Sequence, residues 1–227
     1  MNDPLSASTS RRRVLQASAL GGITAFATPA LAQALANLGL PGSPSMREMT
    51  AAFPQKGPMI LQRNRPPLLE TPMEVFDGSV FTPNDRFFVR WHWAVIPPSV
   101  DVDQFRLKVH GAVERPLSIS LAALLNDLPR VEIAAVNQCS GNSRGFFQPP
   151  VPGGEWGHGA MGNAKWMGVR LRDVLDKAGV KAGARQVRFS GMDEPVVPTG
   201  PDFKKSLAID HARDGEVMLA FAMNGEA

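Results

Sequence analysis

The sequence predicts a mixed α/β (α+β) fold in which short strands and a few short helices are joined by irregular loops. Strand-like segments recur between residues 86 and 223, and one clear helical pattern interrupts them near residue 170. The 21 glycines and 20 prolines among 227 residues indicate many turns. Hydrophobic residues make up 44% of the chain and charged residues 20%, so there is enough apolar material for a globular core.

Residues 1–32 are predicted to be an export signal. Arg11, Arg12 and Arg13 precede an uncharged, mildly apolar stretch at 14–28, and Ala30-Leu31-Ala32 has the small-x-small pattern of a cleavage site. This order resembles the twin-arginine signal, so we expect export of the folded protein to the periplasm by the twin-arginine machinery. The stretch is too short and too weakly apolar to be a good membrane span. The alternative interpretation is an amphipathic N-terminal helix with a basic cap.

Two regions are expected after the signal. Residues 33–66 are rich in Pro, Gly, Met and Arg without a clean period, which predicts an extended N-terminal segment covering 33–78. An aromatic, β-prone run at 86–93 lies near the start of the second region, 79–227. The later elements are expected as a strand at 105–111, a short helix capped by Ser120, a strand at 130–136, a loop at 145–163, a helix at 169–178 stopped by Gly179, and strands at 187–191 and 216–223.

The end of the sequence predicts a hairpin that lacks its second strand. Asn224-Gly225 is a residue pair typical of hairpin turns, and it follows the strand expected at 216–223. The chain stops at Ala227, two residues later. We therefore expect this sequence to be the N-terminal part of a longer protein, with a fold that is incomplete at its C-terminus.

The charge of the chain argues against nucleic acid as its main partner. The formal net charge is +3, and removal of residues 1–32 takes away three arginines and one aspartate, which leaves +1. Binding to a phosphate backbone needs a basic surface, which a nearly neutral protein lacks. A local basic pocket for a small anion stays compatible with this balance.

Cys139 is the one cysteine of the chain, which excludes an internal disulfide and a zinc site built on several cysteines. It follows a predicted strand and precedes a glycine-containing turn, where side chains and backbone N–H groups converge on ligands. Arg144 lies five residues further on, and a nearby cation favours the thiolate, which is a soft metal ligand. The alternative is a buried, inert cysteine that serves as a small hydrophobic residue.

Three segments together resemble the sulfite oxidase family of molybdopterin-dependent oxidoreductases. Cys139-Ser140-Gly141-Asn142-Ser143-Arg144 is similar to the family signature Cys-x-Gly-Asn-Arg/Ser-Arg. Phe88-Val89-Arg90-Trp91-His92 resembles its aromatic-x-Arg-Asn-His segment, and residues 159–175 are similar to its Gly-Ala-Ile/Met-x-Asn/Thr-Ala-Arg-Trp block. The segments occur in the family's order over roughly residues 80–225, which makes the resemblance specific.

The resemblance implies the sulfite-oxidase-type molybdopterin-binding fold and a role for each matching residue. Cys139 would bind molybdenum beside the two sulfurs of one molybdopterin. Arg90, Arg144 and Trp156 would form the substrate pocket, with the two arginines holding an oxyanion through multidentate hydrogen bonds. The residues implied to contact the cofactor are Phe88, Val89, Arg90, Trp91, His92, Cys139 and Asp193. Taken singly, each arginine is equally explained as a surface residue or a cation–π partner, and the tryptophans as packing.

The implied activity is the oxidation of sulfite to sulfate. The chain carries no Cys-x-x-Cys-His haem-attachment motif and no preceding haem domain, so we expect electrons to pass to a separate c-type cytochrome. A homodimer of the full-length protein is a further expectation. The alternatives are a related sulfoxide reductase, which the arginine pair disfavours, and a cofactor-free fragment or binding module of the same fold.

This sequence departs from the family pattern at two points. Trp91 stands where the family has asparagine, which would reshape the edge of the pocket. The chain also contains no tyrosine, and the family's active-site tyrosine and a further arginine would fall beyond Ala227.

Overall fold

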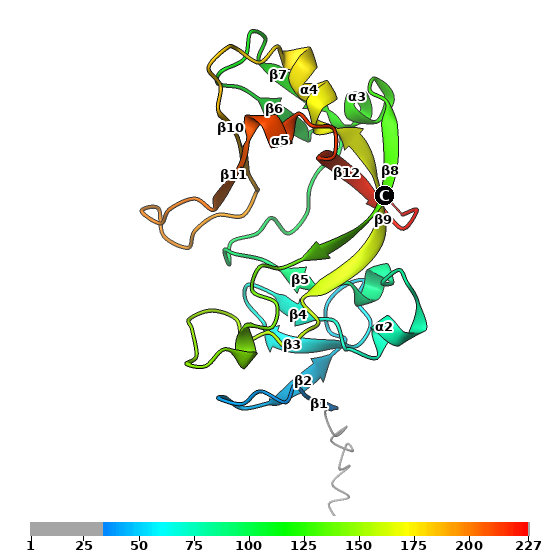
Figure 1. Ribbon diagram of the computed structural model, residues 1–227, viewed down its shortest axis with the longest axis vertical. Helices are drawn as coiled ribbons and strands as arrows, with labels where there is room; N and C mark the ends of the chain where they lie inside the picture. Colours follow the sequence, from blue (N-terminus) through cyan, green and yellow to red (C-terminus); the bar gives the residue numbers. More distant parts are fainter. Residues whose placement is uncertain (1–33, 227) are drawn as a thin grey trace, which may run out of the picture. The chain divides into compact units, whose positions relative to one another are not determined.

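A computed structural model describes residues 34–226, which belong to a single compact unit. The predicted export signal at 1–32 lies outside these residues. Strands predominate, helices are few and short, and the predicted mixed α/β class is confirmed (Figure 1). Within the described part of the chain, no helix has the length and apolar character needed to cross a membrane.

The N-terminal part forms a five-stranded antiparallel sheet, in which every strand pairs with its neighbour in sequence. The segment 33–66 was expected to be irregular, yet it contains three of these strands; each is so short that no period shows, and pairing between strands holds them. The fourth strand pairs with the fifth through Leu69 and Val89, so the sheet crosses the expected boundary at 78/79. The strands are β1 (Leu35–Asn37), β2 (Met46–Thr50), β3 (Met59–Arg63), β4 (Leu68–Glu70) and β5 (Val89–Arg90).

Two short helical segments separate β4 from β5. They are α2 (Val75–Gly78) and the 3-10 helix η1 (Asn84–Arg86). The β-prone run expected at 86–93 is therefore a strand only at Val89 and Arg90, and the residues after it follow an irregular path with an isolated bridge from Val95 to Glu194.

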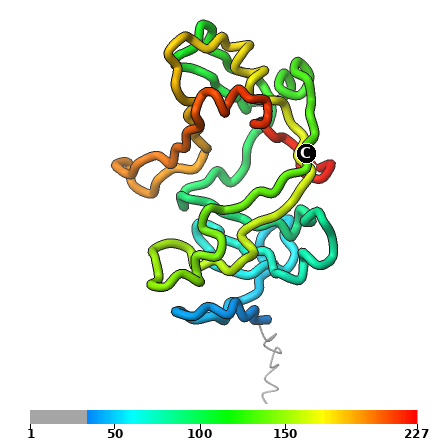
Figure 2. Tube along the Cα trace, in the orientation of Figure 1, coloured from blue at the N-terminus to red at the C-terminus, as the bar shows by residue number. Residues whose placement is uncertain are grey.

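A long hairpin connects the two halves of the unit. β8 (Arg130–Gln138) and β9 (Met161–Arg170) pair over their full length, from Arg130 opposite Val169 to Gln138 opposite Met161. β12 (Met218–Met223) adds to the other edge of β9, which gives the order β12-β9-β8. Figure 2 shows the hairpin running, in green and yellow-green, to the cyan strands of the N-terminal sheet. The connection between β8 and β9 begins at Cys139, so this residue is carried to the junction with that sheet.

The remaining elements cover the other end of the hairpin. Ser120 caps its helix as predicted, because its hydroxyl accepts a hydrogen bond from Ala123 N at 3.1 Å. The helix expected at 169–178 begins at Leu171, since β9 continues to Arg170, and it ends at Gly179, whose φ of 71° is left-handed. The elements are β6 (Arg106–Val109), β7 (Leu117–Ser120), α3 (Leu121–Asn126), α4 (Leu171–Ala178), β10 (Gln186–Ser190), β11 (Lys204–Ala208) and α5 (Ile209–Ala212).

The core of this end lies between α4 and the strands. α4 buries the predicted apolar face, formed by Leu171, Val174, Leu175 and Ala178. Val174 packs with Val169 of β9, while Leu171 packs against α5. After β12, Asn224 and Gly225 both have positive φ, 53° and 86°, as a two-residue hairpin turn requires, and this prediction is confirmed.

Candidate active site

The loop that leaves β8 holds Cys139 through its backbone and its sulfur. Cys139 N donates to Ala160 O at 2.9 Å, and Cys139 O accepts from Asn142 N at 2.9 Å. The backbone N–H of Gly141 donates to the thiol Sγ at 3.4 Å. The thiol is half-buried, and the N–H of Gly141 directed at its sulfur orients the side chain.

The residues after Cys139 keep this loop folded onto the start of β9. The side-chain oxygen of Asn142 accepts from Ala160 N at 2.9 Å. Ser143 adopts a left-handed backbone with φ of 66° and donates its N–H to Gly157 O at 2.7 Å. The motif at 139–144 is therefore a compact turn, and the hydrogen bonds of Asn142 and Ser143 fix the direction of the cysteine.

Glu70, at the end of β4, braces the opposite side of the loop. Its carboxylate is 1% exposed, and it accepts from Gly157 N at 3.0 Å, Gly159 N at 2.9 Å and the amide of Gln62 at 2.6 Å. A Cβ at Gly157 would stand 2.7 Å from this carboxylate, so glycine is required for the close approach. Sequence reasoning missed Glu70, although a lone acid after Leu68-Leu69 was a signal that could have pointed to it.

A cavity of about 330 Å³ brings the cysteine loop and the β5 segment together. It is lined by Phe87, Phe88, Arg90, Asn137 and Cys139. Arg90 and Cys139 were both predicted site residues, and they are 49 positions apart in the chain. A guanidinium and a thiol at one cavity wall can hold an oxyanion beside a bound metal.

His92 stacks on the aromatic ring of Phe203, a contact that the sequence did not predict. Its ring stacks on Phe203 with centroids 3.9 Å apart, and its Nδ1 is 3.3 Å from a guanidinium nitrogen of Arg90. Burial and the neighbouring charge of Arg90 lower the pKa of His92, while Asp193 opposes this shift. The geometry therefore favours a neutral His92 beside a charged Arg90.

Trp91, Trp93 and Asp193 border the same segment. Trp91 is half-buried, and its backbone N–H donates to Pro67 O at 3.4 Å. Asp193 accepts from Trp93 N at 3.2 Å, so its observed contact is with the backbone next to His92. The indole N–H of Trp93 is buried and has no hydrogen-bond partner among residues 34–226. A bound group with an acceptor atom would satisfy this donor.

Two predicted pocket residues take other positions. Trp156 is 2% exposed and packs with Leu68 and Ala160 in a cluster that contacts Cys139, so it supports the cysteine from the core instead of lining the cavity. Arg144 lies over the loop glycines, with its guanidinium 2.8 Å from where a Cβ of Gly141 would be. It is not part of the cavity wall that Arg90 forms. Its role as an oxyanion contact stays a prediction.

His158, for which the sequence indicated no role, belongs to the same loop. Its ring stacks on Phe146 with centroids 4.4 Å apart, and its Nδ1 lies 2.8 Å from the hydroxyl of Ser143. These contacts join the two ends of the loop that starts at Cys139.

The donor set at Cys139 fits a metal that arrives inside an organic cofactor. No three His, Cys, Asp or Glu side chains within residues 34–226 are placed to hold a bare ion. The cavity offers one soft ligand, Cys139, so a metal there needs its remaining ligands from a bound group. A molybdopterin supplies such ligands through its two sulfurs, and the unpartnered indole N–H of Trp93 is consistent with a polar organic group nearby.

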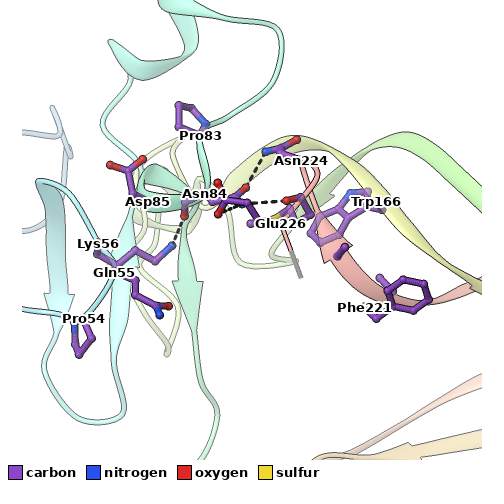
Figure 3. Close-up of a pocket in the computed structure, with 13 residues that line it drawn as sticks. Pro54, Gln55, Lys56, Pro83, Asn84, Asp85, Trp166, Phe221, Asn224 and Glu226 are labelled. Carbon is purple, nitrogen blue, oxygen red and sulfur yellow. Dashed lines mark hydrogen bonds between the residues drawn. The ribbon is translucent and has the colours of Figure 1, made fainter. Parts of the chain in front are cut away.

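A second, larger cavity of about 930 Å³ lies apart from these residues (Figure 3). It is bordered by the turn at 54–56, η1 and β12, and Lys56 is directed towards Asn84. Lys56 donates to Asn84 O at 2.7 Å, and the amide of Asn84 donates to Glu226 at 2.9 Å. Because these polar groups satisfy one another, we assign them to holding η1 against the final turn.

Comparison with known proteins connects this geometry to a family. Residues 93–227 match the family model described as oxidoreductase molybdopterin binding domain. Sulfite oxidase of Gallus gallus is 36% identical over 193 residues, which cover 82% of this chain and 41% of that protein. Mitochondrial sulfite oxidase of Homo sapiens is 40% identical over 171 residues, which cover 71% of this chain and 30% of that protein.

A solved structure agrees with these relatives. The sulfane dehydrogenase SoxCD from Paracoccus pantotrophus superposes with a TM-score of 0.59 and 29% identity, over 71% of this chain and 39% of that chain. The present chain therefore spans less than half the length of each of these relatives.

Proposed function

Because the chain belongs to the sulfite oxidase family of molybdopterin-binding oxidoreductases, we propose that it binds a molybdenum cofactor through Cys139 and oxidises a small sulfur oxyanion held by Arg90. The observation that carries this proposal is the shared cavity, in which a thiol and a guanidinium from distant segments meet. Sulfite is the substrate we propose, since two of the relatives are named sulfite oxidases.

Each residue of the site has a task that its own contacts support. The N–H of Gly141 and the fold of the loop hold the Cys139 sulfur in one direction. Arg90 offers fixed positive charge and several N–H donors to an oxyanion. His92, kept neutral by its surroundings, has ring nitrogens that can donate to and accept from a polar cofactor.

The protein supplies binding and orientation, and the cofactor supplies the redox step. When bound, the molybdenum centre provides two-electron redox chemistry with oxygen transfer, which no side chain of the chain can perform. Phe87 and Phe88 form an apolar part of the cavity wall. A wall of this kind excludes water and strengthens the attraction between Arg90 and an anion.

An uncharged substrate, such as a sulfoxide, gains little from Arg90, so we favour an anionic substrate over that alternative. We also propose export to the periplasm, on the basis of the arginine run at 11–13 and the cleavage pattern that ends at Ala32. A c-type cytochrome is the proposed electron acceptor. Replacement of all three arginines by lysine should leave the protein in the cytoplasm, and unchanged export of that variant would contradict the signal assignment.

The test of the proposed function combines metal analysis with activity. The full-length protein, expressed in a host that makes the cofactor, should contain about one molybdenum per chain and reduce cytochrome c when sulfite is added. Cys139→Ser should lose most of the metal and the activity, whereas Ser140→Ala, a change at the exposed neighbouring residue, should keep both. Normal molybdenum content in Cys139→Ser would refute the role of this cysteine.

A further inference from the structure

A third cavity, of about 400 Å³, lies between two short strands and a helix. β6 and β10 form its walls, and the buried residues Leu171, Val174 and Leu175 of α4 line it from below the strands. Figure 1 shows β6, β10 and α4 close together in one part of the unit. The volume is within the range of about 300–1,000 Å³ that is typical of ligand-binding pockets. None of these elements contributes to the cavity at Cys139.

Both strands face this cavity with one of their edges. Every residue from Leu107 to Val113 and every residue from Gln186 to Ser190 lines it. Side chains of consecutive strand residues point to opposite faces of a sheet, so an unbroken run of lining residues indicates that the backbone edge itself borders the cavity. Within the described residues, β6 pairs with β7 alone and β10 pairs with β11 alone. The second edge of each strand is therefore open.

The polar backbone groups on these open edges have no strand partner. Among residues 34–226, the backbones of 107–110 and 187–190 make no backbone–backbone hydrogen bond beyond the ladders with β7 and β11. The two segments meet beyond the strand ends, at an isolated bridge between Val113 and Val180. Lys181 N also donates to Ala112 O there, at 3.0 Å. An edge that presents unpaired N–H and C=O groups is a template for a further strand.

The two faces of β6 and β10 differ in their chemistry. Their inward residues are apolar and half-buried, and they pack against the core clusters that contain Val174 and Leu175. The alternate residues Lys108, His110 and Arg188 are exposed. No carboxylate is among the residues that line the cavity. A strand placed between the two edges would therefore meet apolar side chains on one face and cations on the other, and opposite charges on neighbouring strands stabilise their pairing.

We propose that the gap between β6 and β10 binds an extended segment of a partner protein in which apolar residues alternate with acidic residues. The segment adds a strand to both open edges and completes one sheet in the order β7-β6-segment-β10-β11. Its apolar side chains pack on α4, and its carboxylates lie beside Lys108 and Arg188. Main-chain hydrogen bonds give affinity in this mode of binding, and alternate side chains give specificity. The interaction does not involve Cys139, so it is independent of the proposed function.

The experiment titrates the full chain into a fluorescently labelled peptide of alternating glutamate and valine. Fluorescence anisotropy should show saturable binding. A peptide of alternating lysine and valine should bind about tenfold more weakly, because it places like charges beside Lys108 and Arg188. Absence of binding by the glutamate–valine peptide, or equal binding of the two peptides, would overturn the proposal.

Two double variants place the binding at the gap. Lys108→Glu combined with Arg188→Glu should reverse the preference, so that the lysine–valine peptide binds more tightly. Lys177→Glu combined with Lys181→Glu changes the net charge equally at exposed residues that do not line the cavity, and it should keep the preference of the parent chain. Circular dichroism should show that all three proteins are folded. An unchanged preference in the folded first variant would contradict the assigned position.

Hydrogen exchange tests the pairing of the backbones directly. Without peptide, the amides of 107–110 and 187–190 that the ladders with β7 and β11 leave unpaired should exchange rapidly, and the bound glutamate–valine peptide should protect them. Protection of these amides without peptide would mean that the chain itself fills the gap, within one copy if the protein sediments as a monomer or through a second copy if it sediments as a dimer. Either result would overturn the proposal of a separate partner.

Discussion

Substitution of Glu70 by glutamine tests whether its carboxylate is what holds the cysteine loop. Glutamine has nearly the same shape, so packing is preserved and only the hydrogen-bonding pattern changes. Oε1 accepts from Gly159 N, while Oε2 accepts from Gly157 N and from the amide of Gln62. An amide has one oxygen and one NH₂ group, and two backbone donors on different oxygens cannot both be satisfied by it.

Both orientations of the new amide leave a buried donor without an acceptor. If the NH₂ group replaces Oε1, it faces Gly159 N; if it replaces Oε2, it faces Gly157 N. A flip of Gln62 would let its oxygen accept from the new NH₂ group, but the glycine N–H would stay unsatisfied and the contact of the Gln62 oxygen with Arg47, at 3.4 Å, would be lost. Loss of a charged hydrogen bond together with an unsatisfied buried donor destabilises a protein by about 3 kcal/mol.

The assay is thermal unfolding of the full chain. For a unit of this size, about 3 kcal/mol corresponds to a decrease in Tm of roughly 6–12 °C. Glu155→Gln is the matched control, since Glu155 lies in the same loop but is 41% exposed and pairs with Arg47 at 3.1 Å. Loss of such a surface pair changes stability by about 0–1 kcal/mol. Hydrogen exchange at Gly157 and Gly159 should become faster only in Glu70→Gln.

The reasoning would be refuted if Glu70→Gln melted within the range of the Glu155→Gln control. That result would mean that the loop before β9 is held by packing alone. A large decrease in Tm without faster exchange at the two glycines would place the effect elsewhere in the sheet.

Three further outcomes are expected. Arg144→Gln should raise the apparent KM for sulfite about tenfold or more if its charge contacts the substrate; a lower Tm with an unchanged KM would show that it only braces the loop. His92→Gln should reduce the loss of stability on acidification: the folded pKa of His92 is lowered by burial and by Arg90, so the unfolded chain protonates first as pH falls below 6.5. Denaturant unfolding at two pH values checks this, and an equal loss in both proteins would contradict it. Gly168→Ala should destabilise by about 1–3 kcal/mol, because its Cβ would overlap a backbone carbonyl of β12. Gly78→Ala, with open space around it, should not, and equal melting temperatures would contradict the close approach of the two strands.

Several elements were predictable because their signals are local. The Ser120 cap, the stop at Gly179 and the turn at Asn224-Gly225 depend on residues a few positions apart, and the structure has all three. Strands β1 to β3 were not predicted, because each is only three to five residues long and gains its order from its partners. A short strand carries too few side chains to show a period.

The residues of the site also fall into those that local motifs predicted and those that only the folded chain revealed. The motif around Cys139 and the segment containing Arg90 were identified from their residues, and the structure places both at one cavity. Trp156 was assigned to the substrate pocket and lies in the core beside Cys139, since a sequence motif does not state which side of a loop a ring occupies. Its role in the pocket stays a prediction. Phe203 carries no motif and was missed, although its ring stacks on His92.

The amino-acid sequence by itself was enough to identify the family and the class of fold and to single out the one cysteine that we propose as the metal ligand, because these depend on residue chemistry at short spacing. Which distant residues meet that thiol depends on the folded chain. Glu70 reaches the loop at 157–159, and Phe203 reaches His92, only because the folded chain brings these parts together. Such contacts are fixed by the summed free energy of pairing and burial over the whole unit, and no local pattern encodes that sum.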